Sequence, residues 1–404
     1  MSVVFDRPYE FVPPHRGTWW PWWVQRLRLV DIYLRKKHGI VSFECRGIDK
    51  LKASASAGDG IILAPNHSRY SDPLAMGWPA RLAGLNFFAM ASWHLFNKSW
   101  FDAFSMRKCG GFSLYREGTD RKSIETAINI LATAERPLIL FPEGMTFRTN
   151  DWVRPLLDGV TFVARSAARK RAKKDDGRVV AHPVAIKYTC PIDMTSWASE
   201  QIEQLESHLN ISPITGFAPR LLQIAESRLG GIEAEHFGDR RDGDTQKRQN
   251  DLVVHLLTRT ENRLGLSPDD PTDIGDRVRA IRTRVASDYF QLSDDSPERD
   301  LLRSDSDTAN LAYDLYAYPD SYLQDDGITD MRVIESVQRL QVSLLGKANR
   351  KIPLHCILEV GDSVEVPPEK APRGQQDPVL ALIRQRLTEM IDRLATEARP
   401  LSES

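Results

Sequence analysis

Short, continuous apolar runs alternate with longer amphipathic segments between about residues 40 and 190. Apolar runs of four to eight residues are typical of strands that are buried on both faces of a sheet. The segments between them, one from Pro73 and two around residues 123–134 and 155–171, have the pattern of helices. Strands separated by helices favour an α/β fold with a mostly parallel sheet flanked by helices. The predicted strands cover residues 61–64, 86–91, 112–115, 138–141 and 179–188.

The pattern changes at about residue 191, where strand signals disappear and helical periodicity continues to about residue 350. An apolar run at residues 354–360 then predicts one more strand, and an amphipathic helix follows from about residue 378. Because a strand returns after the helices, we expect an all-helical unit inserted into the α/β domain. The predicted units are 1–40, an N-terminal anchor; 41–190, the α/β domain; 191–350, the helical insertion; 351–367, the returning strand; and 368–404, a C-terminal helix.

The N-terminal segment combines tryptophans with basic residues. Trp19, Trp20, Trp22 and Trp23 surround a proline, and a helical pattern with apolar residues on one face follows. Tryptophan prefers the headgroup level of a bilayer, and basic flanking residues are attracted to anionic lipid. We therefore expect an N-terminal helix that lies on a membrane surface. The alternative is a helix that packs on the protein's own core.

The composition limits which binding partners and which cellular compartment are expected. The 54 Lys and Arg residues nearly cancel the 55 Asp and Glu residues, so no overall field favours nucleic acid. Four scattered cysteines without a CxxC pair predict reduced thiols rather than disulfides or a zinc site. No apolar run approaches the roughly 18 residues of a membrane span, and no signal-peptide pattern is present. We expect a cytoplasmic protein, peripherally associated with the cytoplasmic face of a membrane.

The first candidate for chemistry is the stretch Asn66–Pro73, directly after a predicted buried strand. His67 and Asp72 would lie about 140° apart on a continuous helix, too far round to cooperate. Asp72 before Pro73, however, predicts a helix N-cap with proline at the first position, so that His67 lies on the preceding turn. A carboxylate there can fix the ring tautomer and stabilise the imidazolium of a general base. The alternative is a loop histidine bonded to a helix cap.

Two further sites follow predicted strands. Arg116 comes after Gly110-Gly111 and a strand, and arginine suits bidentate contact with phosphate. A surface ion pair with Glu117 or Asp120 is the alternative. Glu143, in the stretch Phe-Pro-Glu-Gly at 141–144, could accept from an acceptor hydroxyl or hold Arg116, or could simply belong to a strand-end turn. All three sites are expected at the same edge of the sheet.

These stretches occur in the order of a known set of sequence blocks. NHxxxxD covers residues 66–72, GxFxxxR covers 110–116 and FPEG covers 141–144, while PVAIKY at 183–188 is a looser fourth block. In residues 55–190 the chain resembles the PlsC-type glycerolipid acyltransferases, also called the lysophospholipid acyltransferase family. The first three blocks together carry the resemblance.

The resemblance implies an enzyme in which His67, oriented by Asp72, deprotonates a hydroxyl that attacks an acyl-CoA or acyl-carrier-protein thioester. Arg116, Glu143 and Gly144 would bind the acceptor, with its phosphate on the arginine, and neither a metal nor a bound cofactor is expected. The family usually continues the third block with Thr-Arg-Ser, whereas this chain has Met145-Thr146-Phe147-Arg148. Thr146 and Arg148 are therefore displaced, and we expect them to contact the acceptor through a longer loop.

The expected reaction is acyl transfer to 1-acyl-sn-glycerol 3-phosphate, which gives phosphatidic acid. Transfer to glycerol 3-phosphate or to another lysophospholipid is the alternative that the altered third block favours. A non-catalytic lipid-surface scaffold that retains the fold is a second alternative, and the size of the predicted insertion is its main support. The expected partners are a thioester donor, a lysophospholipid acceptor and a membrane surface.

Overall fold

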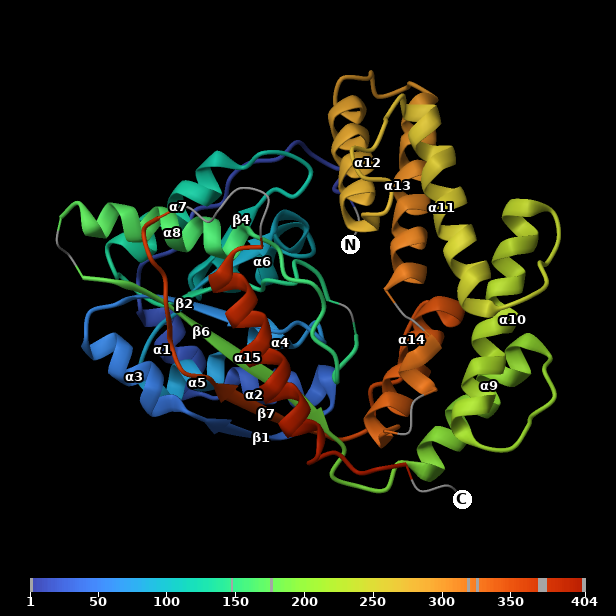
Figure 1. Cartoon of the computed structure of the whole chain (residues 1–404), viewed down its shortest axis with the longest axis horizontal. Coiled ribbons are helices and arrows are strands. Elements are labelled where there is room, and N and C mark those ends of the chain that lie inside the picture. The colour runs from blue at the N-terminus through green and yellow to red at the C-terminus, as the bar shows by residue number, and fades with distance from the viewer. Residues whose placement is uncertain are drawn as a thin grey trace.

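The computed structural model describes residues 3–146, 148–174, 177–317, 320–324, 327–369 and 376–401. Its α/β part is built around one mixed, mostly parallel sheet, and its α-helical part lies to one side (Figure 1). The predicted fold class, a mostly parallel sheet flanked by helices with an added helical region, is confirmed.

In the described part of the chain, eight strands form a single sheet in the order β1-β7-β6-β2-β5-β3-β4, with β8 paired to β6. All neighbouring strands are parallel except that β6 is antiparallel to β7 and β8. The carboxyl ends of β2, β5, β3 and β4 therefore meet at one edge. The strands are β1 (Ile40–Arg46), β2 (Gly60–Pro65), β3 (Phe88–Ser92), β4 (Gly111–Leu114), β5 (Leu138–Ile139), β6 (Val179–Thr189), β7 (Leu354–Val360) and β8 (Val364–Glu365).

Strand β2 shows why the apolar runs form buried strands. Ile61 and Leu63 contribute to a core on one face of the sheet, whereas Ile62 and Ala64 contribute to a second core on the other face. Each fully buried aliphatic side chain stabilises the fold by roughly 1.5–3 kcal/mol. One face is covered by α3 (Ile48–Ser56), α4 (Asp72–Ala75) and α5 (Gly77–Ala83), and the other by α7 (Arg121–Ala132), α8 (Gly159–Ala172) and α15 (Pro378–Ala395).

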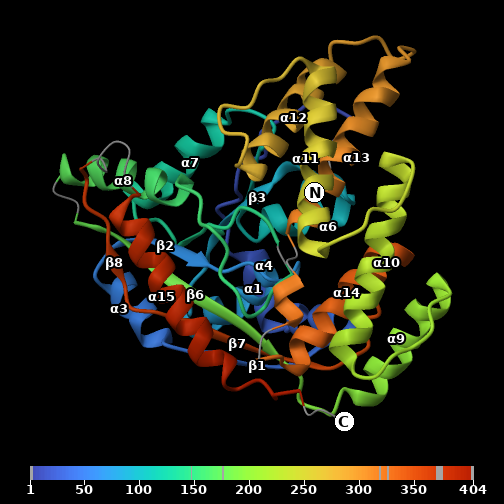
Figure 2. The same cartoon turned by 45° about the vertical axis from the view of Figure 1, so that its right-hand side comes forward.

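The α-helical part lies between β6 and β7 in the sequence and consists of two structural groups. Leu205, Leu221 and Ile334, from three of its helices, share the core of the first sheet face. The other three helices pack around a separate core that includes Leu256 and Ile281, and they project away from the sheet (Figures 1 and 2). The first group is α9 (Thr195–Leu209), α10 (Phe217–Phe237) and α14 (Asp330–Leu345), and the second is α11 (Thr245–Leu264), α12 (Ile274–Tyr289) and α13 (Glu298–Tyr316).

The N-terminal tryptophans lie on a short helix rather than on one long one. Helix α1 (Trp19–Arg26) ends before Arg28, whose left-handed φ of 51° separates it from α2 (Leu29–His38). Trp19, Trp22 and Trp23 are 47–55% exposed. Trp20 instead packs against Phe104, with ring centroids 5.2 Å apart. That phenylalanine belongs to α6 (Trp100–Lys108).

Helix α6 adds to the exposed aromatic surface of α1. Trp100 is 78% exposed and Phe101 is 58% exposed. The charged Lys108 lies over the rings of Trp19 and Phe104. We call Trp19, Trp22, Trp23, Trp100 and Phe101 the aromatic face. Over the residues that the structure describes, none of the helices combines the length and the apolar character needed to cross a bilayer.

Candidate active site

The loop after β2 is fixed to the neighbouring strand. Asn66 donates from Nδ2 to the carbonyl oxygen of Ile186 at 3.0 Å and accepts from the Ile186 N–H at 2.7 Å. Its own N–H donates to Val184. These contacts continue the pairing of β2 with β6 by one residue, so the backbone that carries His67 leaves the sheet in a defined direction.

His67 and Asp72 are in contact, as their spacing predicts. His67 Nδ1 lies 3.0 Å from Asp72 Oδ2. The helix begins one residue earlier than expected, because Asp72 is the first residue of α4 rather than its N-cap. The carboxylate accordingly bonds back to the loop, where it accepts the Arg69 N–H at 2.8 Å. On its other oxygen it accepts the Tyr188 hydroxyl at 2.6 Å.

The tautomer of His67 follows from these contacts. A carboxylate accepts hydrogen bonds, so Nδ1 carries the hydrogen and Nε2 has a free lone pair. The hydroxyl of Thr146 lies 3.0 Å from Nε2 and donates to it. The imidazole is 12% exposed and packs against the Phe141 ring at a centroid distance of 4.2 Å. A hydroxyl thus stands at the basic nitrogen of a histidine whose other nitrogen contacts a buried carboxylate.

Glu143 holds the His67 backbone in place. Its carboxyl group is buried and accepts the His67 N–H at 2.9 Å. Burial raises its pKa to about 8, although hydrogen bonds from the His67 and Arg154 backbones favour the charged form. The following Gly144 has a φ of +71°, and a Cβ there would lie 2.5 Å from Leu157 Cδ1. The turn that presents these groups therefore requires glycine.

Arg116 follows β4, three strands away from β2 in the sheet order. At a strand spacing of roughly 4.8 Å, the backbones of the two sites lie on the order of 14 Å apart. The backbone N–H of Arg116 donates to its neighbour Glu117 at 3.2 Å. Burial lowers the pKa of Arg116 to about 10, and Arg282 and Tyr313 of helices α12 and α13 lie near its charge. This arginine therefore faces the α-helical part.

Two other histidines form hydrogen bonds within the fold, away from His67. His182 is buried between the Ser54 hydroxyl at 3.0 Å and the Gly361 carbonyl at 2.9 Å. His94 contacts the Ser92 hydroxyl at 2.9 Å, and burial lowers its pKa to about 3. Within the described ranges, the structure brings together no group of three or more His, Cys, Asp or Glu side chains suited to a metal ion.

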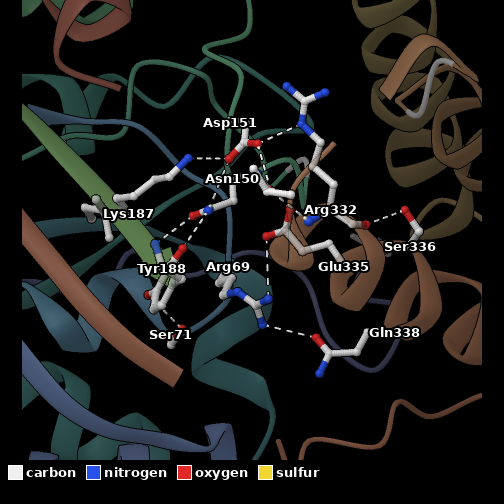
Figure 3. Close-up of polar contacts among 12 residues, drawn as sticks. Arg69, Ser71, Asn150, Asp151, Lys187, Tyr188, Arg332, Glu335, Ser336 and Gln338 are labelled. Atoms are coloured by element: carbon white, nitrogen blue, oxygen red, sulfur yellow. Dashed lines mark hydrogen bonds and ion pairs between the residues drawn. The ribbon is translucent and has the colours of Figure 1, made fainter. Parts of the chain in front are cut away.

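A buried ion cluster joins the site to the α-helical part through α14 (Figure 3). Asp151 lies between Lys187 of β6 and Arg332 of α14, with the Arg332 Nε 2.7 Å away. All three residues are buried. These contacts were not predicted from the sequence. A lysine inside the apolar run of β6 is nevertheless a signal for them, because a buried lysine needs a charged partner.

A second set of contacts in the same region involves Glu335 of α14. This carboxyl group accepts the Tyr322 hydroxyl at 2.6 Å and the Asn150 N–H at 3.0 Å. It also lies 3.5 Å from the guanidinium of Arg69, which bonds Gln338 as well (Figure 3). Arg69 and Asn150 lie on the loops that carry His67 and Thr146. We call the residues that join these loops to α14 the α14 network: Arg69, Asn150, Asp151, Lys187, Tyr322, Arg332, Glu335 and Gln338.

Comparison with known proteins gives two matches. Residues 42–187 match the family described as acyltransferase. A 1-acyl-sn-glycerol-3-phosphate acyltransferase of Streptococcus pneumoniae (strain ATCC BAA-255 / R6) is 34% identical to this chain over 107 residues. That segment is 26% of this chain and 37% of the relative, so the chain spans little more than a third of the relative's length. The family match contains His67, Asp72, Arg116 and Glu143.

Proposed function

We propose that this chain, whose residues 42–187 match the acyltransferase family, transfers a fatty acyl group from a thioester to 1-acyl-sn-glycerol 3-phosphate and so produces phosphatidic acid. The observation that carries the proposal is the position of the His67 imidazole between the Asp72 carboxylate and a hydroxyl 3.0 Å from Nε2. The Streptococcus pneumoniae relative, a 1-acyl-sn-glycerol-3-phosphate acyltransferase, supports this choice of acceptor.

In the proposed reaction His67 acts as general base. Nε2 removes the proton of the acceptor hydroxyl while the oxygen of that hydroxyl forms a bond to the thioester carbonyl carbon. The tetrahedral intermediate then expels the thiolate, which takes the proton from the imidazolium. Asp72 stabilises that imidazolium, and its bonds from Tyr188 and Arg69 keep it in place. The acceptor hydroxyl takes the place at Nε2 that the Thr146 hydroxyl holds.

The acceptor is proposed to lie along the edge at which the parallel strands end. Arg116 and Arg148 supply positive charge for its phosphate, since arginine binds phosphate in a bidentate manner. Thr146 contacts the acceptor beside its hydroxyl. Glu143 and Gly144 contribute by shaping the loop around His67.

We also propose that the protein associates peripherally with a membrane through the aromatic face on α1 and α6. Tryptophan side chains exposed by 47–78% beside basic residues suit the headgroup region of a bilayer. Such an association would bring the site to an acceptor that is itself a membrane lipid.

The test uses purified full-length protein, labelled acyl-CoA or acyl-carrier protein, and liposomes that contain one acceptor at a time. The acceptors are 1-acyl-sn-glycerol 3-phosphate, glycerol 3-phosphate and a lysophospholipid with a substituted phosphate. We expect labelled phosphatidic acid as the main product. Preferential acylation of glycerol 3-phosphate would replace the acceptor in this proposal, and absence of transfer to every acceptor would reject the acyltransferase.

A further inference from the structure

A small cavity lies between the His67 loop and the α-helical part. Its volume is about 50 Å³. A water molecule needs roughly 10–15 Å³ on the same measure, so the cavity holds a group of a few heavy atoms and not an acyl chain. It is lined by residues of four segments, including Ser68, Arg69, Arg148, Glu335, Gln338 and Arg350.

The cavity has an excess of positive charge. Its lining contains the three arginines Arg69, Arg148 and Arg350 and a single carboxyl group, Glu335, whose pKa burial raises to about 7, so the lining carries at least two net positive charges. Burial lowers the pKa of Arg350, and the nearby charges of Arg69 and Arg148 lower it further. Clustered cations of this kind repel one another in the absence of an anion. The fourth basic side chain, His38, is neutral near pH 7, because burial lowers its pKa to about 4.

Two polar atoms at this cavity lack hydrogen-bond partners in the part of the chain that the structure describes. The Ser68 hydroxyl belongs to a residue that is 1% exposed. The second atom is Nε of Arg69, whose two terminal nitrogens contact Gln338 and Glu335. An unsatisfied buried polar group costs roughly 1–3 kcal/mol. A ligand that accepts hydrogen bonds would satisfy both groups.

The backbone at Arg148 supports the same interpretation. Its φ of +58° is in the left-handed region, which costs a non-glycine residue roughly 1–2 kcal/mol. The conformation places its guanidinium over the Tyr70 ring at 5.5 Å, and both residues line the cavity. Strain of this kind is concentrated at functional sites.

We propose that this cavity binds a phosphate monoester of one of the two substrates, and that Arg350, from the segment that joins α14 to β7, completes the site. A phosphate dianion matches the charge of the lining, offers acceptors to Ser68 and Arg69, and forms bidentate contacts with arginine. The assignment to a substrate rests on the proposed function. Because Arg350 lies outside residues 42–187, the α-helical part and its return to the sheet contribute directly to substrate recognition.

The test measures binding without turnover. Isothermal titration calorimetry with full-length protein uses sn-glycerol 3-phosphate, which stands for the acceptor head group, and CoA, which carries a 3′-phosphate monoester, in separate titrations. Arg350→Ala is compared with wild type and with Lys351→Ala, a matched variant that removes one exposed positive charge from the next residue. We expect Arg350→Ala to weaken binding of one probe at least tenfold, and Lys351→Ala to leave it within twofold of wild type.

The two probes identify the source of the phosphate. Selective loss of glycerol 3-phosphate binding assigns the cavity to the acceptor, and selective loss of CoA binding assigns it to the donor. Equal effects of Arg350→Ala and Lys351→Ala, no effect of either, or no binding of either probe by wild type would overturn the proposal. Binding that depends on Arg350 in a protein that transfers no acyl group would keep the cavity and reject the acyltransferase, and transfer without such binding would do the reverse.

Discussion

Glu143 is a buried acid whose side chain contacts the backbone of the loop that carries His67. It accepts the His67 N–H, and its burial raises its pKa to about 8. An acid at this position costs little while it is protonated, because a neutral carboxyl group needs few compensating charges. Its ionisation, by contrast, opposes folding.

This arrangement predicts a pH dependence of stability. The pKa of Glu143 rises from 4.5 in the unfolded chain to about 8 in the folded one. Its contribution to the free energy of unfolding is therefore fully present below pH 4.5. This contribution is lost as the pH rises through 8, by up to about 1.4 kcal/mol per pH unit. Glu143→Gln keeps the acceptor for the His67 N–H but does not ionise. Urea unfolding at pH 5, 6, 7 and 8 should show that this variant gains stability relative to wild type as the pH increases.

The exposed Glu125 of α7 provides the control, because Glu125→Gln should differ from wild type by the same small amount at every pH. A difference between Glu143→Gln and wild type that does not change with pH would contradict the assignment.

At the residue scale, the sequence predicts the His67–Asp72 contact because both residues belong to one short turn that proline terminates. It does not predict the Tyr188 hydroxyl on Asp72, since these residues lie 116 positions apart. The contact requires the pairing of β2 with β6, which no local pattern specifies. Residue types within a turn are thus easier to infer than partners across the sheet.

At the scale of elements, α14 connects the loops of the site to the α-helical part through buried charges that compensate one another. Asp151 compensates both Lys187 and Arg332 in a region that solvent does not reach. Removing one partner of a buried pair leaves an uncompensated charge and typically costs about 3–5 kcal/mol. The network is therefore expected to fix the loops rigidly.

Asp151→Asn tests this expectation. The variant should lose about 3–5 kcal/mol in free energy of unfolding, measured by urea denaturation, because Lys187 remains buried without a counter-charge. Asp294→Asn removes a carboxylate that is 91% exposed and paired with Arg299, and it should cost less than about 1 kcal/mol. Equal losses in the two variants would mean that the buried cluster contributes no more than a surface pair.

The sequence predicts those elements whose residues are buried on both faces. Strand β2 is fully buried and stands out as an apolar run. Strand β1 lies at the sheet edge with several exposed residues, and it gives no comparable signal. The break between α1 and α2 was missed because it depends on one backbone angle at Arg28, a residue type compatible with a continuous helix.

At the scale of the whole molecule, segments far apart in sequence form the aromatic face. Trp19, Trp22 and Trp23 come from α1, and Trp100 and Phe101 come from α6. The sequence points to the tryptophans of α1 but does not reveal α6 beside them, because the packing of Trp20 on Phe104 joins the two helices. That packing also separates Trp20, which is structural, from its exposed neighbours.

The aromatic face yields a prediction for membrane binding. Replacing Trp19, Trp22 and Trp23 together by Ala, with Trp20 left in place, should weaken flotation with anionic liposomes at least about tenfold while far-UV circular dichroism stays unchanged. Val254→Ala combined with Leu301→Ala removes exposed apolar side chains from α11 and α13 and should float like wild type. Unchanged flotation of the tryptophan variant would refute the proposed surface.

The proposed mechanism requires the His67 imidazole to remove the acceptor proton. Its most direct test is the kcat/KM for acyl transfer to 1-acyl-sn-glycerol 3-phosphate, measured for wild type, for His67→Ala and for His208→Ala, which alters an exposed histidine of α9. We predict a loss of about 10²–10⁴-fold for His67→Ala and none for His208→Ala, with the secondary structure of both intact. Transfer by His67→Ala at the wild-type rate would show that His67 is not the general base.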